Sequence, residues 1–172
     1  YFPMGLLHFH LDQLPGVTRF LSSVLIASGD HHKGLQELQL AMERGDLFRD
    51  LAQAELSSVY VNFERKPAQA LGLTMELRER FPRNFNFTFS LGIILSELGE
   101  FEEAHTVARE LGKEIRGGSL APQLQPRLDH LLGRILFDQG DHDRAADHFQ
   151  KALLDREPIN ARIRASALLR LG

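Results

Sequence analysis

Residues 132–145 read LGRILFDQGDHDRA, and two other stretches of the chain follow the same pattern. Residues 91–104 read LGIILSELGEFEEA, and residues 21–34 read LSSVLIASGDHHKG. Each stretch has a Leu followed by a small residue, an apolar run, a Gly with an acid directly after it, and a small residue five places beyond that Gly. Because an internal repeat fixes the architecture before single elements are assigned, this pattern decides the fold.

The repeat has a regular spacing along the chain. The small residues after the turn are spaced by 36, 34 and 41 residues, and they are Gly34, Ala70, Ala104 and Ala145. A second set of corresponding positions, upstream of the first, has the same spacing; its residues are Leu21, Ser57, Leu91 and Leu132. The longer last step contains Gly117-Gly118-Ser119, so we expect an inserted loop near 117–125.

The local pattern predicts two helices in each repeat. Apolar residues at 91, 94, 95 and 98 share one helical face. Gly99 favours the end of that helix, and Glu102 and Glu103 favour the start of the next one. The alternating Phe residues of 85–89 would read as a strand in isolation. The repeat register instead predicts a helix there, on which Phe85 and Phe89 share a face and Phe87 does not.

This pattern resembles the tetratricopeptide repeat (TPR). The most complete copy carries Leu132-Gly133, Leu136, Gly140, Ala145, Phe149, Ala152-Leu153 and Pro158. Asp129 stands where an aromatic residue is expected, and repeat two has Ser57-Ser58 for the large-small pair and Arg65 for the turn Gly. The resemblance implies an all-α fold, a right-handed α-solenoid of about four and a half helix-turn-helix repeats.

The register divides the chain into a capping helix and an array. We expect the N-terminal capping helix at 1–14 and the array at 15–172, with bounds of 15–50, 51–84, 85–125, 126–157 and an incomplete repeat at 158–172. The N-terminal residues Gly5 to Pro15 also look like the opening of one TPR family, which has mitochondrial outer-membrane and lipid-droplet links in eukaryotes and bacterial counterparts. A generic capping helix is the alternative interpretation.

Composition excludes several classes of function. The chain has 172 residues, 43% hydrophobic and 25% charged, with a formal net charge of -3, so bulk charge gives no argument for binding nucleic acid or an anionic membrane. It has no Cys, which excludes disulfides and thiolate metal sites. No apolar run is long enough to suggest a membrane span. The sequence is compatible with a location in the cytoplasm or in the periplasm.

The candidate chemical groups do not form a recognisable site. The densest acid and His cluster is Asp141, His142, Asp143, Asp147 and His148. Asp143 and Asp147 could chelate a cation at their i,i+4 spacing, but acids early in a helix are explained by the helix dipole. The sequence contains no phosphate-binding glycine loop, no nucleophile elbow and no catalytic triad spacing. We therefore expect a protein that is not an enzyme, with no cofactor and no metal.

The family resemblance places ligand contacts on the first helix of each repeat. The expected groove residues are Glu55, Val59, Asn62, Asn86, Phe89, Ile93, Arg127, His130 and Arg134. The groove would be apolar in the middle and basic toward repeat four, which suits a peptide with hydrophobic anchors and an acidic end. Glu55 and Val59 stand where some TPR co-chaperones carry the Lys and Asn of a carboxylate clamp, so chaperone tails are disfavoured.

Two functions follow from this pattern. The first is a protein-protein interaction scaffold that binds a peptide or protein segment in the groove. The second is a structural segment of a larger multi-repeat protein that self-assembles. The last helix would expose Ile159, Ile163 and Leu171, so either the natural chain continues past Gly172 or that face pairs with another copy.

Overall fold

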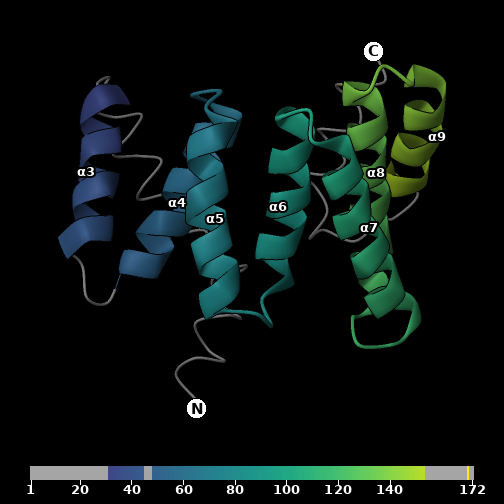
Figure 1. Ribbon diagram of the computed structural model, residues 1–172, viewed down its shortest axis with the longest axis horizontal. Coiled ribbons are helices and arrows are strands. Elements are labelled where there is room, and N and C mark those ends of the chain that lie inside the picture. Colours follow the sequence, from purple (N-terminus) through teal and green to yellow (C-terminus); the bar gives the residue numbers. More distant parts are fainter. Residues whose placement is uncertain (1–30, 45–47, 154–169, 171–172) are drawn as a thin grey trace. The chain divides into compact units, whose positions relative to one another are not determined.

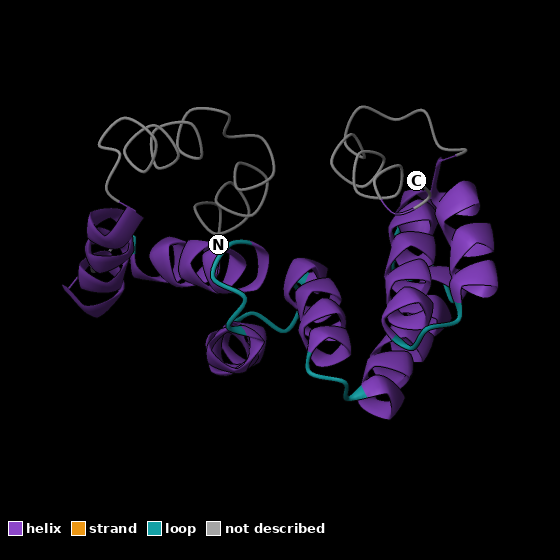
Figure 2. Cartoon of the chain, turned by 90° about the horizontal axis from the view of Figure 1, so that it is seen from above, coloured by secondary structure: helices purple, strands orange, loops and turns teal. Residues whose placement is uncertain are grey.

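The computed structural model describes residues 31–44, 48–153 and 170, and within these ranges it contains helices and no strand (Figures 1 and 2). The elements are α3 (His31–Arg44), α4 (Arg49–Asn62), α5 (Pro67–Arg80), α6 (Phe85–Glu97), α7 (Phe101–Arg116), the short 3-10 helix η1 (Pro122–Leu124), α8 (Gln125–Asp138) and α9 (His142–Leu153). The prediction of an all-α helical repeat fold is confirmed. The expected cap at 1–14 and most of 158–172 lie outside the described residues.

The chain divides into two compact units, Tyr1–Val59 and Tyr60–Gly172. In the first unit, α3 buries Leu35 and Leu38 on one helical face. Helix α4 carries the chain from the first unit into the second and buries Leu56. The second unit holds the repeats that match the sequence pattern best.

In the second unit, α5 to α9 pack each against the next, and α6 also packs against α8 (Figure 1). Because α6 and α8 are the first helices of two successive repeats, this contact stacks one repeat on the other. The core lies between α6, α7 and α8. Its buried side chains include Phe89, Leu111, Leu131 and Ile135.

The alternating Phe segment forms the start of α6, as the repeat register predicts. Asn84 caps the helix, because its Oδ1 accepts a hydrogen bond from the backbone N–H of Asn86 at 3.1 Å. Phe89 and Phe85 belong to the same core cluster. Phe87 turns elsewhere, with its ring centroid 6.2 Å from that of Phe81. The segment is therefore helical, as its place in the repeat predicts, although its alternating sequence is typical of a strand.

The turns between paired helices use the left-handed conformation. Gly99 has φ 80° and Gly140 has φ 87°, and after each of them a backbone N–H bonds the carbonyl five residues back at 2.9 Å. Arg65 occupies the corresponding position of repeat two, and it also has a positive φ of 54°. The degenerate repeat therefore keeps the turn without its Gly, although this conformation costs a non-Gly residue about 1–2 kcal/mol.

Small residues stand where paired helices approach closely. A Cβ on Gly133 would lie 2.7 Å from two ring carbons of Phe149 and 3.2 Å from the backbone oxygen of Ala145. A Cβ on Gly92 would lie 2.9 Å from a methyl carbon of Leu131, which can move more easily. Close contact with a neighbouring helix therefore explains why each Leu of these pairs is followed by Gly.

Replacing Gly133 by Ala should lower the free energy of unfolding by about 1–3 kcal/mol, because the new methyl group has no space against Phe149 and a fixed carbonyl. The matched control is Gly72→Ala in α5, where nothing lies within 4 Å of the new Cβ. That variant should gain about 0.5–1 kcal/mol from helix propensity. Urea denaturation followed by circular dichroism measures both changes. A Gly133→Ala variant as stable as the parent would contradict the close approach.

The connection from α7 to α8 contains the segment interpreted as an inserted loop. Helix α7 ends at Arg116, Gly118 has φ 79°, and η1 leads directly into α8. Leu120 is buried in the core cluster, so this connection also contributes to packing.

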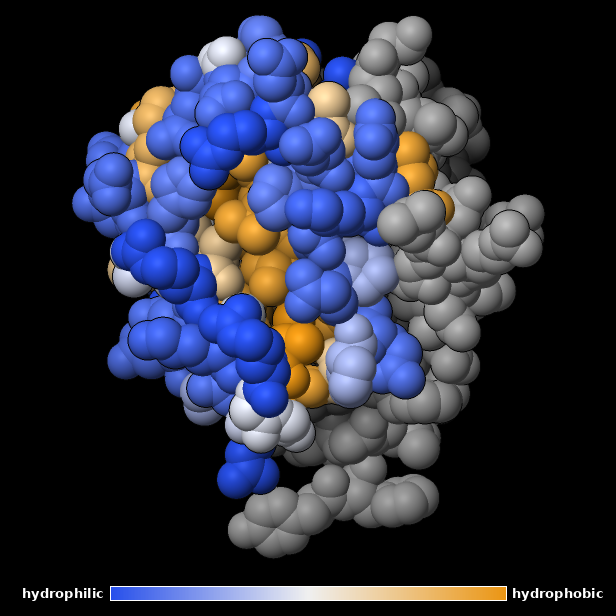
Figure 3. Space-filling view, turned by 90° about the vertical axis from the view of Figure 1, so that its right-hand side faces the viewer, coloured by the Kyte–Doolittle hydropathy of each residue, from blue (hydrophilic) through white to orange (hydrophobic). Residues whose placement is uncertain are grey.

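The surface at the α8–α9 end of the second unit has a hydrophobic strip between hydrophilic ridges (Figure 3). Repeat units leave apolar surface of this kind because each one packs on a neighbour. Within the described ranges, every helix is too short or too polar to cross a lipid bilayer.

Candidate functional site

The side chains that face one another across α6 and α8 form the candidate site. We call this set the α6–α8 face and define it as Asn86, Ile93, Glu97, Arg127, Arg134 and Asp138. Sequence reasoning selected Asn86, Ile93, Arg127 and Arg134 from this set. Two polar bridges join the helices, one near each end of the face.

One bridge is centred on Arg134. Its guanidinium donates to Glu97 Oε1 on α6, and its Nε lies 3.9 Å from Asp138 Oδ2 on its own helix. Ser96 donates its hydroxyl to the same Asp138 carboxylate at 2.6 Å. The Arg134 side chain is only 12% exposed, and burial together with Arg170 lowers its pKa to about 10. Arg134 remains charged at neutral pH, and two carboxylates offset that charge.

The other bridge is centred on Arg127. Its guanidinium donates to Asn86 Oδ1 on α6 and lies 4.4 Å above the centroid of the Phe89 ring. A cation over an aromatic face is held by the negative potential of the ring. These contacts fix the Arg127 head group at the start of α8.

His130 lies between the two bridges along α8. Its ring centroid is 5.9 Å from that of Phe149, and its buried Nε2 has no hydrogen-bond partner among the described residues. Burial, together with the positive charges of Arg170 and Arg127, lowers the pKa of His130 from 6.5 to about 4. The effect of both cations on one imidazole shows that positive charge gathers at this part of α8.

Three expected groove residues need a correction. Val59, Phe89 and His130 are buried, so their side chains do not form an open contact surface. Phe89 is 1% exposed because it fills the core between α6, α7 and α8. His130 is buried because it packs toward Phe149 of α9. Repeat positions did not reveal this burial, because one helix face serves both core and surface, and the groove as a set stays a prediction.

Glu55 and Val59 lie on α4 within the first unit, and Asn62 ends that helix in the second unit. Asn62 is exposed and Glu55 is partly exposed. The possible oligomer residues Ile159, Ile163 and Leu171 lie outside the described residues.

Sequence reasoning missed the two carboxylates of this face. Each stands one helical turn after a predicted groove residue, Glu97 after Ile93 and Asp138 after Arg134. The sequence carried a signal for them, because residues four apart share one face of a helix. What the sequence could not show is that both carboxylates converge on Arg134, which is 37 residues from Glu97.

Asp129, at the position where the family pattern has an aromatic residue, connects α8 with α9. It is buried and accepts a hydrogen bond from Gln125 Nε2 at 3.0 Å. His148 Nδ1 on α9 lies 3.0 Å from the other carboxylate oxygen. A polar contact therefore joins α8 and α9 where the family pattern has an aromatic ring.

The same contacts account for part of the acid and His cluster of α9. His148 pairs with Asp129, and Asp141 caps the helix by accepting from the backbone N–H of Arg144 at 3.2 Å. Among the described residues, no three His, Cys, Asp or Glu side chains gather closely enough to hold a metal ion.

These observations define the class of protein: a helical repeat protein in which two-helix units stack through their first helices. Residues 87–110 and 126–151 match the family model of the tetratricopeptide repeat, and they correspond to α6–α7 and α8–α9. These two matches support membership of the tetratricopeptide repeat superfamily. Proteins with these repeats generally mediate protein-protein interaction and are generally not catalytic. No curated protein matches the chain.

Proposed function

We propose that this protein is a non-catalytic interaction scaffold and that the α6–α8 face binds a peptide or protein segment. The observation that carries the proposal is the pair of polar bridges that hold Arg127 and Arg134 in fixed positions across two first helices. Side chains that are held before the ligand arrives lose little freedom on binding, which favours affinity.

The charge distribution supports an orientation for the ligand. Arg127 stands in the first turn of α8, where the positive end of the helix dipole adds to its charge. We therefore expect the acidic part of the ligand near Arg127 and an apolar residue near the partly buried Ile93.

Selection of peptides from a random display library on the purified protein tests this proposal. The selected peptides should combine apolar residues with Asp or Glu near one end. Their affinity should fall by about tenfold in Arg127→Glu, because the ligand then meets a like charge at a partly buried position. The matched control is Arg109→Glu, the same charge reversal at an exposed position of α7.

Circular dichroism of both variants ensures that each is folded. Equal affinity of the selected peptides for the parent and Arg127→Glu would count against the α6–α8 face. Equal loss in both variants would show a bulk charge effect and would also reject the proposed site.

A further inference from the structure

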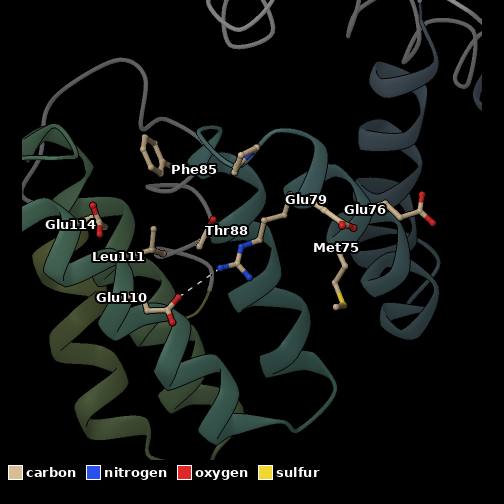
Figure 4. Close-up of a pocket in the computed structure, with 10 residues that line it drawn as sticks. Met75, Glu76, Glu79, Phe85, Thr88, Glu110, Leu111 and Glu114 are labelled. Carbon is tan, nitrogen blue, oxygen red and sulfur yellow. Dashed lines mark ion pairs between the residues drawn. The ribbon is translucent and has the colours of Figure 1, made fainter.

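The second unit has another concave feature, which the α6–α8 face does not include. A pocket of about 780 Å³ is formed by α5, α6, α7 and the connection between α5 and α6. Its lining residues from α6 are Phe85 and Thr88, which differ from the α6 residues of the candidate site (Figure 4). The pocket is therefore a separate surface.

The pocket has an apolar floor. Phe85 and Leu111 belong to the core cluster and reach the pocket from α6 and α7. Pro82 and Met75 extend this apolar surface toward α5, and Met75 is 55% exposed. A large hydrophobic side chain exposed beside a pocket favours contact with an apolar group of a partner.

Most charges around this floor are carboxylates. Four Glu residues and one Arg line the pocket, which gives it a net charge of -3, equal to that of the whole chain. Glu110 and Glu114 are four residues apart and share one face of α7, and Glu76 and Glu79 are three apart on α5. Negative charge collected in a hollow attracts a cationic partner more strongly than the same charge spread over the surface.

Arg78 shows which kind of side chain this arrangement accepts. It stands on α5, and its Nη2 lies 3.7 Å from Glu110 Oε2 of α7, the ion pair marked by the dashed line in Figure 4. The pair is loose, since this distance exceeds that of a close ion pair, and both side chains are well exposed. Arg78 and Glu110 both line the pocket, so a cation is already held beside the carboxylates there.

We propose that this pocket docks a basic amphipathic helix of a partner protein. Apolar residues of that helix would cover Met75 and Phe85, and its Lys or Arg side chains would reach Glu79 and Glu114. One of these cations would replace Arg78 at Glu110. The occupant is chosen by charge complementarity, because an acidic segment would meet like charge and a purely apolar segment would bring no cation to the pocket carboxylates.

A designed peptide provides the probe. It carries Leu and Lys at helical spacing over about four turns, and its matched partner has Glu in place of every Lys. Fluorescence anisotropy at low salt measures binding of each labelled peptide to the full chain. We expect the Lys peptide to bind, the Glu peptide not to bind, and added salt to weaken the complex.

Two variants move the affinity in opposite directions. The double variant Glu79→Gln/Glu114→Gln should weaken binding by about three- to tenfold. Arg78→Ala should strengthen binding by about two- to fivefold, because it removes the competing cation. The matched controls are Glu102→Gln/Glu103→Gln and Arg109→Ala, which make the same charge changes at exposed positions of α7 outside the pocket.

Thermal unfolding of each variant ensures that changes in affinity do not come from unfolding. Equal effects of the pocket variants and their controls would overturn the proposal, as would equal binding of the two peptides. Unchanged or weaker binding by Arg78→Ala would also overturn it. Arg127→Glu should leave this peptide bound, so that a failure here is distinct from a failure of the α6–α8 face.

Discussion

Phe89→Ala should lower the free energy of unfolding by about 3–5 kcal/mol, the cost of truncating a fully buried aromatic side chain. Phe89 is 1% exposed and packs among residues of α6, α7 and α8. Its removal leaves a cavity that rigid neighbouring helices fill only in part. The Arg127 guanidinium also loses the ring beneath it, which is worth about 0.5–2 kcal/mol.

Urea denaturation of the purified protein measures this loss. The matched control is Phe63→Ala, since Phe63 is 71% exposed and its truncation should change stability by less than about 0.5 kcal/mol. Phe89→Leu keeps much of the apolar volume and should fall between the two. If Phe89→Ala were as stable as Phe63→Ala, Phe89 would not be a core residue. It follows that binding assays of the groove should not use Phe89→Ala, because loss of fold would mimic loss of binding.

The second large effect is a pH dependence of stability that comes from His130. The pKa of His130 in the folded protein is lowered from 6.5 to about 4 by burial and by Arg170 and Arg127. Between these two values the unfolded chain binds more protons than the folded protein, so stability rises with pH. The contribution is complete above about pH 6.5 and is lost as the pH falls toward 4. Its full size is on the order of 3 kcal/mol.

Urea denaturation at a series of pH values, for the parent and His130→Leu, isolates this contribution. The parent should lose more stability than the variant between about pH 6.5 and pH 4, because only the parent has the imidazole that must remain neutral to stay buried. Titration of the His130 ring signals by NMR gives the folded-state pKa directly. Parallel stability curves for the two proteins would show that the imidazole is not held neutral by its surroundings.

Much of the repeat could be predicted from sequence because its signals are local. Gly99 and Gly140 end their helices through backbone conformation, which depends on few neighbours. Alignment of the repeats placed Arg65 where the others have the turn Gly, and Arg65 takes the same left-handed conformation. The repeat register was enough to reject a strand at residues 85–89, because a helical array offers such a strand no partner.

The candidate site was predictable only in part. Repeat positions selected Asn86, Arg127 and Arg134, and these side chains do take part in bridges across α6 and α8. The same positions also selected Phe89 and His130, which are buried. A repeat position fixes the direction of a side chain from its helix, but the neighbouring helix decides whether that direction leads to solvent.

The sequence by itself determined that this chain has a tetratricopeptide-type helical repeat fold. It also determined the positions of the turns and of the recurring small residues such as Gly133. These properties follow from backbone conformation and helical periodicity, which act over a few residues. Only the tertiary structure decided that Arg134 meets Glu97, that Asp129 joins α8 to α9, and that Arg78 reaches Glu110 across a pocket. Those contacts join residues 19 to 37 positions apart, and they depend on how helices pack, which no local pattern encodes.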